Sequence, residues 1–212
     1  SSPAARRLAD DAKQVASKLP LSFVRPMGLT AAGGAERCRI EVGSIVECLA
    51  TFVDPATGEP RLACGSYDVK IYDPVAGGAA LVVIDVSASA LAVFKDPATG
   101  EPRLACGCDD GKVRIFDPIA GGEALLFLEM GSRVYSLAVF EDPSTGALRL
   151  ACGSGNRLGG KAQIFDPVAG GQALLVLDIG DYVKALAVFK DPATGVPRLA
   201  CASGEKVLAF CL

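Results

Sequence analysis

Short runs of hydrophobic residues, separated by turns rich in Asp, Pro and Gly, make up most of the chain from residue 45 onwards. One unit contains four such runs in order, namely SLAVF, LRLACGS, a run such as KVRIF and a run such as EALLFLEM. In KVRIF the apolar Val113 and Ile115 alternate with polar residues, which is the period of a β-strand. The intervening DPSTG and DPIAGG segments carry the residues of tight turns. The pattern therefore predicts four short antiparallel strands per unit.

The unit occurs four times along the chain. Each copy opens with a variant of LAVFKDPATG, whose Asp lies at Asp54, Asp96, Asp142 and Asp191. Successive copies are therefore 42, 46 and 49 residues apart. A variant of RLACGS follows every copy, and a variant of RIFDPIAGG follows the first three. Four strands repeated with a period in the forties predict the blades of a β-propeller.

The second copy resembles a WD-repeat unit. Its sequence RLACGCDDGKVRIFDPIAGGEALLFL contains a Leu-Ala-Ser-Gly-like strand, a D-D-G turn, and a strand that ends in an aromatic residue and Asp. The pairs that match the Trp-Asp position of this family are Tyr72 with Asp73, Phe116 with Asp117, and Phe165 with Asp166. The resemblance covers residues 33–212, although the His and Trp of the usual repeat are absent. It implies an all-β fold, a β-propeller of four-stranded antiparallel blades.

Four blades are predicted, with repeats at residues 45–86, 87–130, 131–179 and 180–212. The last repeat stops at its third strand. Residues 32–52 align without gaps to residues 120–140, so residues 35–42 correspond to a fourth strand. We expect residues 35–42 to pair antiparallel with residues 206–212, in the same chain or in a second copy, and to complete the last blade. A compact four-bladed ring, a homodimer that forms an eight-bladed ring, and a fragment of a longer protein all remain open.

Residues 1–20 follow a helical period instead. Their apolar positions share one helix face, at Ala5, Leu8, Ala12, Val15, Ala16 and Leu19. Ser2 followed by Pro3 is a typical helix start. We therefore expect a short N-terminal α-helix over residues 1–20 and a linker over residues 21–34. The helix either packs on its own propeller or docks onto another subunit.

Composition narrows the function classes. The chain has 212 residues with a formal net charge of -3, which lacks the basic character of a nucleic-acid binder. It contains no apolar run of about 18 residues, so no transmembrane helix is expected. It contains no His, which removes the Ser–His and Cys–His pairs of nucleophilic catalysis and the commonest metal ligand. We therefore expect a protein that is not an enzyme.

The eight cysteines are expected to be free thiols. Four of them hold the same place in each second strand, at Cys64, Cys106, Cys152 and Cys201. Residues that recur once per blade do not converge on one metal ion, and free Cys packs as a small hydrophobe. The other four, Cys38, Cys48, Cys108 and Cys211, lack the spacing of a disulfide framework. The thiols predict a reducing intracellular compartment, either the cytoplasm or an organelle interior after processing.

The remaining candidate sites are explained as turns. An Asp before Pro accepts a backbone N–H two residues further on, which favours a structural role over catalysis. The DDG segment at residues 109–111 is too short for a calcium loop. The glycine-rich residues 153–161 lack the ending of a phosphate-binding loop, so they predict an enlarged hairpin. No cofactor and no metal are expected.

The repeats differ most in two sets of loops, those between the second and third strands and those between the fourth and first strands. In a WD-repeat propeller both sets lie on one face of the ring. On this resemblance the predicted partner-binding residues are Tyr67, Asp68, Asp109, Asp110, Arg133, Tyr135, Asn156, Arg157, Leu158, Asp181, Tyr182 and Lys184. Tyr and Arg are enriched at the energetic centres of protein interfaces.

The function expected from the sequence is a protein–protein interaction scaffold or a structural subunit of a larger assembly. Its partners would be other protein subunits. Two alternatives remain. One is a propeller that binds a small molecule or a glycan. The other is an accessory subunit of a photosynthetic or respiratory complex in an organelle.

Overall fold

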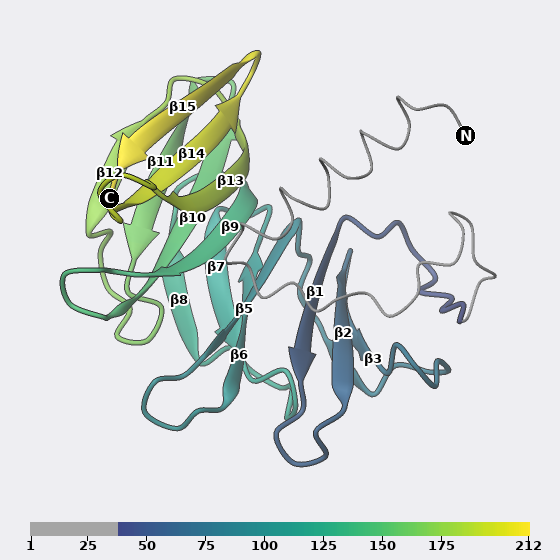
Figure 1. Cartoon of the computed structure of the whole chain (residues 1–212). Coiled ribbons are helices and arrows are strands. Elements are labelled where there is room, and N and C mark those ends of the chain that lie inside the picture. Colours follow the sequence, from purple (N-terminus) through teal and green to yellow (C-terminus); the bar gives the residue numbers. More distant parts are fainter. Residues whose placement is uncertain (1–37) are drawn as a thin grey trace, which may run out of the picture. The chain divides into compact units, whose positions relative to one another are not determined.

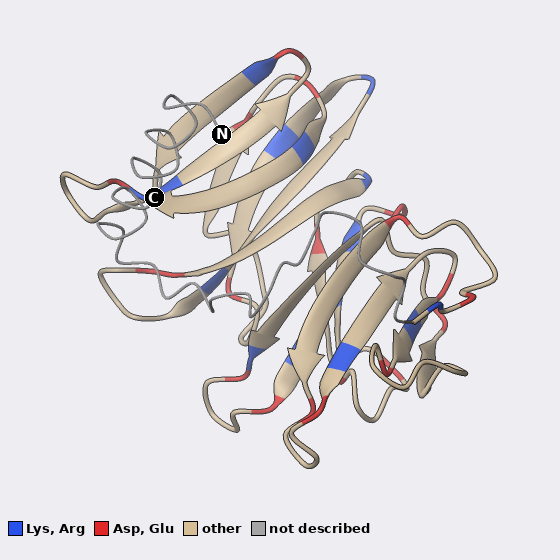
Figure 2. Ribbon diagram, turned by 45° about the vertical axis from the view of Figure 1, so that its right-hand side comes forward, with Lys and Arg blue, Asp and Glu red and all other residues tan. Residues whose placement is uncertain are grey.

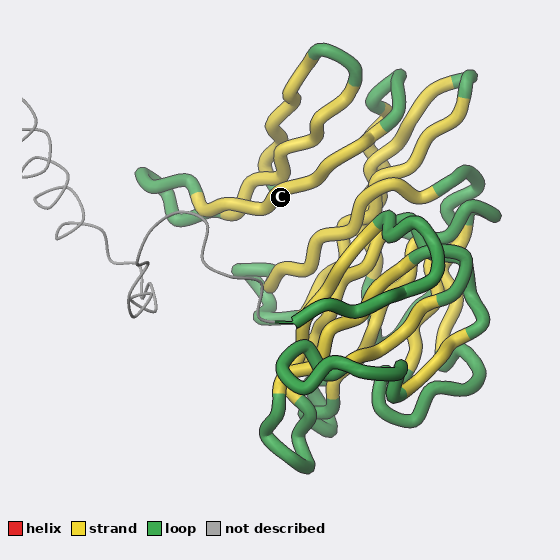
Figure 3. The backbone as a smooth tube through the Cα atoms, turned by 90° about the vertical axis from the view of Figure 1, so that its right-hand side faces the viewer, coloured by secondary structure: helices red, strands yellow, loops and turns green. Residues whose placement is uncertain are grey.

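The computed structural model describes residues 38–212, which contain fifteen β-strands and no helix (Figure 3). None of these residues therefore forms a helix that could cross a membrane. The predicted N-terminal helix (residues 1–20) and linker (residues 21–34) lie outside the described residues. The all-β fold class is confirmed for the part of the chain that the structure describes.

The strands form four antiparallel sheets in chain order (Figure 1). The first sheet comprises β1 (Cys48–Val53), β2 (Pro60–Gly65), β3 (Val69–Tyr72) and β4 (Val82–Ile84). The second comprises β5 (Ala90–Lys95), β6 (Pro102–Gly107), β7 (Lys112–Phe116) and β8 (Leu126–Glu129). The third comprises β9 (Val134–Glu141), β10 (Leu148–Asn156), β11 (Gly159–Phe165) and β12 (Leu175–Asp178). The last has only β13 (Val183–Lys190), β14 (Pro197–Ser203) and β15 (Lys206–Cys211).

Each sheet has two faces, because neighbouring side chains along a strand point to opposite sides. In the first sheet Ala50 pairs with Ala63, and Ala63 pairs with Ile71, so these side chains share one face. We call this side of each sheet the forward face. Leu49 pairs with Cys64 on the opposite side, which we call the backward face. The repeat places equivalent residues on the equivalent faces of the later sheets.

Consecutive sheets pack with the forward face of one against the backward face of the next. The first hydrophobic cluster joins two sets of three residues, Phe52, Ile71 and Ile84 from the first sheet and Leu104, Cys106 and Phe116 from the second. The second and third clusters join the later sheets through equivalent positions. Full burial of one such large side chain contributes about 1.5–3 kcal/mol. This packing accounts for the apolar residues that every repeat retains.

The cysteine predictions are confirmed by the packing. All eight cysteines are free, and those of the four second strands, Cys64, Cys106, Cys152 and Cys201, are buried. Burial raises the pKa of the Cys106 and Cys201 thiols, because the charged thiolate loses solvation. Cys106, Cys152 and Cys201 fill space between sheets as small hydrophobic side chains.

An Asp–Arg–Asp arrangement ties the strands of the first sheet together. The Nη2 atom of Arg61 lies 3.1 Å from Oδ2 of Asp54, and its Nη1 lies 4.0 Å from Oδ2 of Asp73. Arg61 thus bridges the turn after β1 and the turn after β3. The second and third sheets repeat the arrangement with Asp96, Arg103 and Asp117, and with Asp142, Arg149 and Asp166. It links the strands of a blade without the His and Trp of the usual WD repeat.

The acidic members of these groups also shape the turns, as predicted. Oδ1 of Asp54 accepts a hydrogen bond from the N–H of Ala56 at 2.9 Å. Oδ1 of Asp73 accepts from the N–H of Val75 at 2.7 Å. In Figure 2 the acidic residues gather in the turns at the strand ends, whereas many basic residues lie within strands. The repeated carboxylates are therefore structural parts of each blade.

Within one chain the predicted fourth strand of the last blade is not formed, and its pairing with a second copy stays a prediction. Residues 38–42, the described part of residues 35–42, form no strand and do not pair with β15. Val42 instead contacts the first sheet, where its carbonyl oxygen accepts a hydrogen bond from Nζ of Lys70 on β3 at 2.9 Å. Within residues 38–212 the last sheet is therefore three-stranded, and β15 is its edge.

Candidate interaction surface

Two tyrosines and a lysine meet where β9 and β13 begin. The ring centroids of Tyr135 and Tyr182 lie 5.6 Å apart, and the ring planes are inclined at 77° in an edge-to-face contact. Nζ of Lys184 lies 3.7 Å from the Tyr135 centroid and 4.9 Å from the Tyr182 centroid. A cation over an aromatic face contributes about 0.5–1 kcal/mol at an exposed site. The three side chains thus form one contact group across two sheets.

The backbone around these residues explains why they meet. Oγ of Ser136 on β9 donates a hydrogen bond to the carbonyl oxygen of Val183 at 3.1 Å, which ties the third sheet to the last. Gly155 on β10 allows the close approach of Tyr182, since a Cβ atom at Gly155 would lie only 2.7 Å from the Tyr182 Cα. The first two copies have Tyr67 and Asp109 at the equivalent position, so this close approach is a feature of the third sheet and not of every repeat.

Arg133 extends the group to the first and second sheets. Its guanidinium carbon lies 5.2 Å from the Tyr135 ring centroid. Its Nη2 donates a hydrogen bond to Oε2 of Glu47 at 3.1 Å. Its Nε lies 2.9 Å from Oδ1 of Asp109, at ion-pair distance but without the alignment of a hydrogen bond. Half-exposed pairs of this kind contribute about 0–1 kcal/mol each, so they orient Arg133 more than they stabilise the fold.

We name these residues the cation–aromatic cluster: Glu47, Asp109, Arg133, Tyr135, Tyr182 and Lys184. Five of them are residues predicted from the sequence. Glu47 was not predicted, although it aligns with Tyr135 in the gap-free alignment of residues 32–52 with residues 120–140. That equivalence was the signal that could have identified it. The two loop sets of the prediction do meet here, because Asp109 lies between β6 and β7 and Arg133 between β8 and β9.

Four other predicted residues lie outside the cluster, and three of them have local partners. Tyr67 is exposed on the turn after β2, and its neighbour Asp68 forms an ion pair with Lys70. Asp110 accepts a hydrogen bond from Nη1 of Arg114 at 3.0 Å, and this contact lowers the pKa of the Asp110 carboxyl. Oδ1 of Asp181 accepts from the N–H of Tyr182 at 2.7 Å. Two of these residues adjoin the cluster in the chain, Asp110 beside Asp109 and Asp181 beside Tyr182.

The last three predicted residues, Asn156, Arg157 and Leu158, form the tip of the β10–β11 hairpin. Asn156 pairs with Gly159, so the glycine-rich segment is an extended hairpin, as predicted. Oδ1 of Asn156 accepts a hydrogen bond from the N–H of Leu158 at 2.8 Å, and the Leu158 side chain is 97% exposed.

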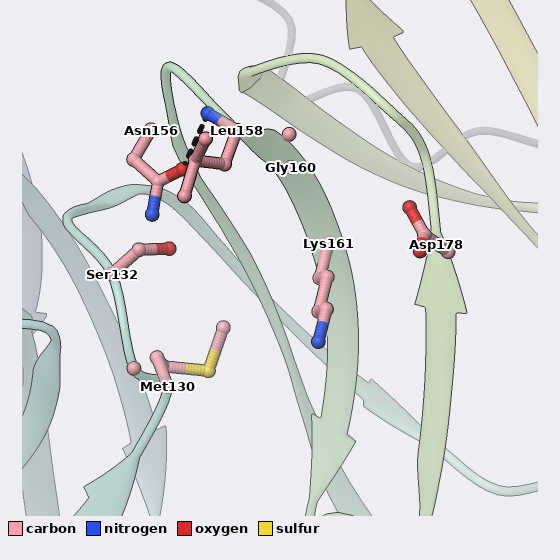
Figure 4. Close-up of a pocket in the computed structure, with 9 residues that line it drawn as sticks. Met130, Ser132, Asn156, Leu158, Gly160, Lys161 and Asp178 are labelled. Atoms are coloured by element: carbon pink, nitrogen blue, oxygen red, sulfur yellow. Dashed lines mark hydrogen bonds between the residues drawn. The ribbon is translucent and has the colours of Figure 1, made fainter.

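An open pocket of about 310 Å³ lies beside this hairpin (Figure 4). Its lining includes Met130 and Ser132 from the loop after β8, and Lys161 and Asp178 from β11 and β12. Backbone glycines form much of the remaining wall. The pocket brings one cation and one carboxylate near the hairpin tip, but it shares none of its lining residues with the cation–aromatic cluster.

Comparison with known proteins identifies the fold. No family model matches the chain, and no curated protein sequence matches it. The computationally designed protein Ika4 is similar in structure, with a TM-score of 0.59 at 22% identity over 84% of this chain and 99% of Ika4. So is the WD40 protein Sqt1 from Saccharomyces cerevisiae, with a TM-score of 0.56 at 18% identity over 77% of this chain and 44% of Sqt1.

A third similar structure is the propeller BBS1N, solved in complex with ARL6DN. Its TM-score is 0.57 at 16% identity, over 80% of this chain and 52% of BBS1N. The chain thus spans about half the length of Sqt1 and of BBS1N. Together with the four successive sheets, these likenesses show a β-propeller-like fold.

Proposed function

We propose that this chain is a WD-repeat-like β-propeller without enzyme activity that serves as a protein-interaction scaffold. It binds its protein partner through the cation–aromatic cluster. The observation that carries the proposal is the contact of Arg133 and Lys184 with the rings of Tyr135 and Tyr182. The near-identical strands and turns of the repeats serve the fold, whereas this group occurs at one place in the described chain.

The chemistry of the cluster suits a protein surface. Tyr presents a large area with few freely rotating bonds, and Tyr and Arg together dominate the binding energy of many interfaces. The ring contact and the cation contacts hold Tyr135 and Tyr182 in one arrangement before binding, which lowers the entropy cost of association. Glu47 and Asp109 add acceptors beside Arg133, so a partner meets both charge signs around an aromatic centre.

WD-repeat membership and the cellular compartment are part of the same proposal. The aromatic–Asp pairs of the repeats support membership of the WD-repeat family. In one of these pairs, Asp73 accepts hydrogen bonds from two N–H groups of the turn that follows it. Eight free cysteines, several of them buried, support a reducing intracellular compartment. The complex of BBS1N with ARL6DN is a precedent for a propeller of this kind in a protein assembly.

Quantitative affinity capture tests the proposal. The full chain and the double variant Tyr135→Ala/Lys184→Ala are immobilised in parallel, and bound proteins are compared by mass spectrometry. We expect at least one partner to be retained by the wild type and lost from the double variant. The matched control is Thr99→Ala/Thr145→Ala, which alters two exposed turns that lie outside the cluster. Equal retention by the wild type and the cluster variant, or loss from the control alone, would contradict the proposal.

A further inference from the structure

Residues 38–42 lie against the first sheet in the same way that a fourth strand lies against the sheet after it. Gly77, with φ +70°, is closely approached by Cys38, whose Sγ would lie 2.8 Å from a Cβ atom placed there. Gly121 holds the same place in the second sheet, and there the approaching atom is Cγ1 of Val82 on β4. In the third sheet Leu126 on β8 approaches Gly170 in the same way. Cys38 therefore occupies the position of a fourth-strand residue.

A second contact of residues 38–42 with the first sheet also has an equivalent between the second and third sheets. Nζ of Lys70 on β3 donates to the carbonyl oxygen of Val42 at 2.9 Å. In the third sheet Nε2 of Gln163 donates to the carbonyl oxygen of Met130 at 3.2 Å. Lys70 and Gln163 are equivalent because each pairs with the cysteine of its second strand. Met130 directly follows the fourth strand β8, so Val42 holds the position at the end of a fourth strand.

The backward face of the first sheet is uncovered at its inner strand. Leu49 and Val53 are 58% and 59% exposed. The equivalents of Leu49 in the later sheets, Leu91, Leu137 and Leu186, are only partly exposed because the preceding sheet packs on them.

The forward face of the last sheet is uncovered as well. Phe189 is 44% exposed, whereas the equivalent Phe52 and Phe94 are buried against the next sheet. Val207 on β15 is 72% exposed, and the equivalent Val69 is fully buried. Among residues 38–212 no hydrophobic cluster joins the last sheet to the first. The two uncovered faces are thus the two halves of an interface that the chain already forms three times.

We propose that a second copy of this chain supplies the missing contacts. Its β13, β14 and β15 pack on the uncovered first sheet, and β15 takes residues 38–42 as its fourth strand. The last sheet of this chain packs in the same way on the first sheet of the second copy. Two chains related by a two-fold axis thus close a ring of eight blades. Closure of this kind removes the exposed edge of β15.

A second copy fits this position better than the same chain. Residues 38–42 remain attached to their own first sheet and not to their own β15. Because β15 of the same chain does not pair with them, this contact is assigned to the last sheet of another molecule.

The equivalence fixes the register of the junction. Ile71 pairs with Val82, and Val69 pairs with Ile84, in the first sheet. Ala209 is the β15 equivalent of Ile71, because each pairs with the Ala of its second strand. Cys38 aligns with Val82, so we expect Cys38 of one chain opposite Ala209 of the other. Directly opposed residues on antiparallel strands lie within the distance that a disulfide spans.

Cysteine cross-linking tests the proposal. Ala209→Cys is introduced into the full chain together with Cys211→Ser, which removes the neighbouring exposed thiol. Under mild oxidation we expect a covalent dimer on a non-reducing gel. Its matched control also carries Cys38→Ser and should give no covalent dimer on the same gel. A disulfide between Cys38 and the introduced thiol within one chain, or a dimer that persists without Cys38, would overturn the proposal.

The mass of the native protein provides a second readout. Light scattering should give twice the mass of one chain. Leu49→Asp should yield a folded monomer, because a charge then faces the apolar junction, whereas Leu158→Asp on the exposed hairpin should leave the dimer intact. A wild-type monomer, or a Leu49→Asp variant that remains dimeric, would overturn the proposal. Equal partner capture by the wild type and the Tyr135→Ala/Lys184→Ala variant, with the dimer intact, would contradict only the function proposed above, so the two failures are distinguishable.

Discussion

Tyr182 lies between Gly155 and Tyr135, with its backbone against the glycine and its ring edge-to-face with the tyrosine. The glycine determines how closely the loop before β13 approaches the third sheet. The ring contact then determines where the aromatic surface points. Tyr182 thus couples the packing at Gly155 on β10 to the orientation of the Tyr135 ring in the proposed binding surface.

The coupling predicts the effect of Gly155→Ala. The added methyl group would fall 2.7 Å from the Tyr182 Cα, so the loop must shift and the two rings separate. We expect partner affinity to fall at least tenfold while the unfolding transition remains cooperative. Surface plasmon resonance and thermal unfolding on the same preparation measure the two effects. Unchanged affinity would show that the ring arrangement does not determine binding.

Truncation of Phe165 should reveal the contribution of the packing between sheets. This side chain is 1% exposed in the cluster between the second and third sheets. Phe165→Ala removes buried apolar surface and leaves a cavity, which costs about 3–5 kcal/mol. Urea unfolding measures the loss. Leu158→Ala, at the exposed hairpin tip, should stay within about 0.5 kcal/mol of the wild type.

Arginine geometry should matter more than charge at Arg61. This residue bridges Asp54 and Asp73 through two different nitrogen atoms, a geometry that a lysine ammonium does not reproduce. We therefore expect Arg61→Lys to lower the urea midpoint almost as much as Arg61→Ala. A lysine variant as stable as the wild type would show that charge alone is sufficient there.

Acid should weaken the fold through the turn carboxylates. A hydrogen bond from the Ser144 hydroxyl, followed by the Ser144 N–H, lowers the pKa of Asp142 from 3.8 to about 2. A pKa that is lower in the folded state means that the unfolded chain binds protons more readily. The stabilisation is therefore present at neutral pH and is lost as the pH falls from about 4 towards 2. Urea midpoints measured across this pH range test the trend. The Asp142→Asn variant should show a weaker dependence of the urea midpoint on pH.

Thiol reactivity should separate two classes of cysteine. Burial raises the pKa of Cys48 to about 12 and shields Cys106 completely, whereas Cys211 is exposed. In native buffer we expect rapid reaction at Cys211 and very slow reaction at Cys106. In denaturant all eight thiols should react. Rapid native labelling of Cys106 would contradict the packing between the first two sheets.

Much of the fold could be predicted from the sequence because the repeat makes each blade a copy of the others. The alternation in each strand identified the sheets, and the constant position of Cys106 and its equivalents identified the core. The bridge from Arg61 to two turns was not predicted, because it joins segments whose proximity depends on the finished sheet.

The candidate site was predicted less completely, for a similar reason. Arg133 and Glu47 are 86 positions apart, and no local pattern links them. The alignment of residues 35–42 with a fourth strand was sound as a comparison of sequences. It could not determine which sheet these residues contact, since a strand of this kind touches both the blade that it completes and the next one.

Hydrogen exchange on the complex with a captured partner tests the central claim most directly, because it locates the bound surface without altering a residue. The account predicts slower exchange at residues 131–136 and 180–184 in the complex, with no change in the turn at residues 96–100. Slower exchange confined to that turn and its equivalents, with the cation–aromatic cluster unaffected, would contradict the account.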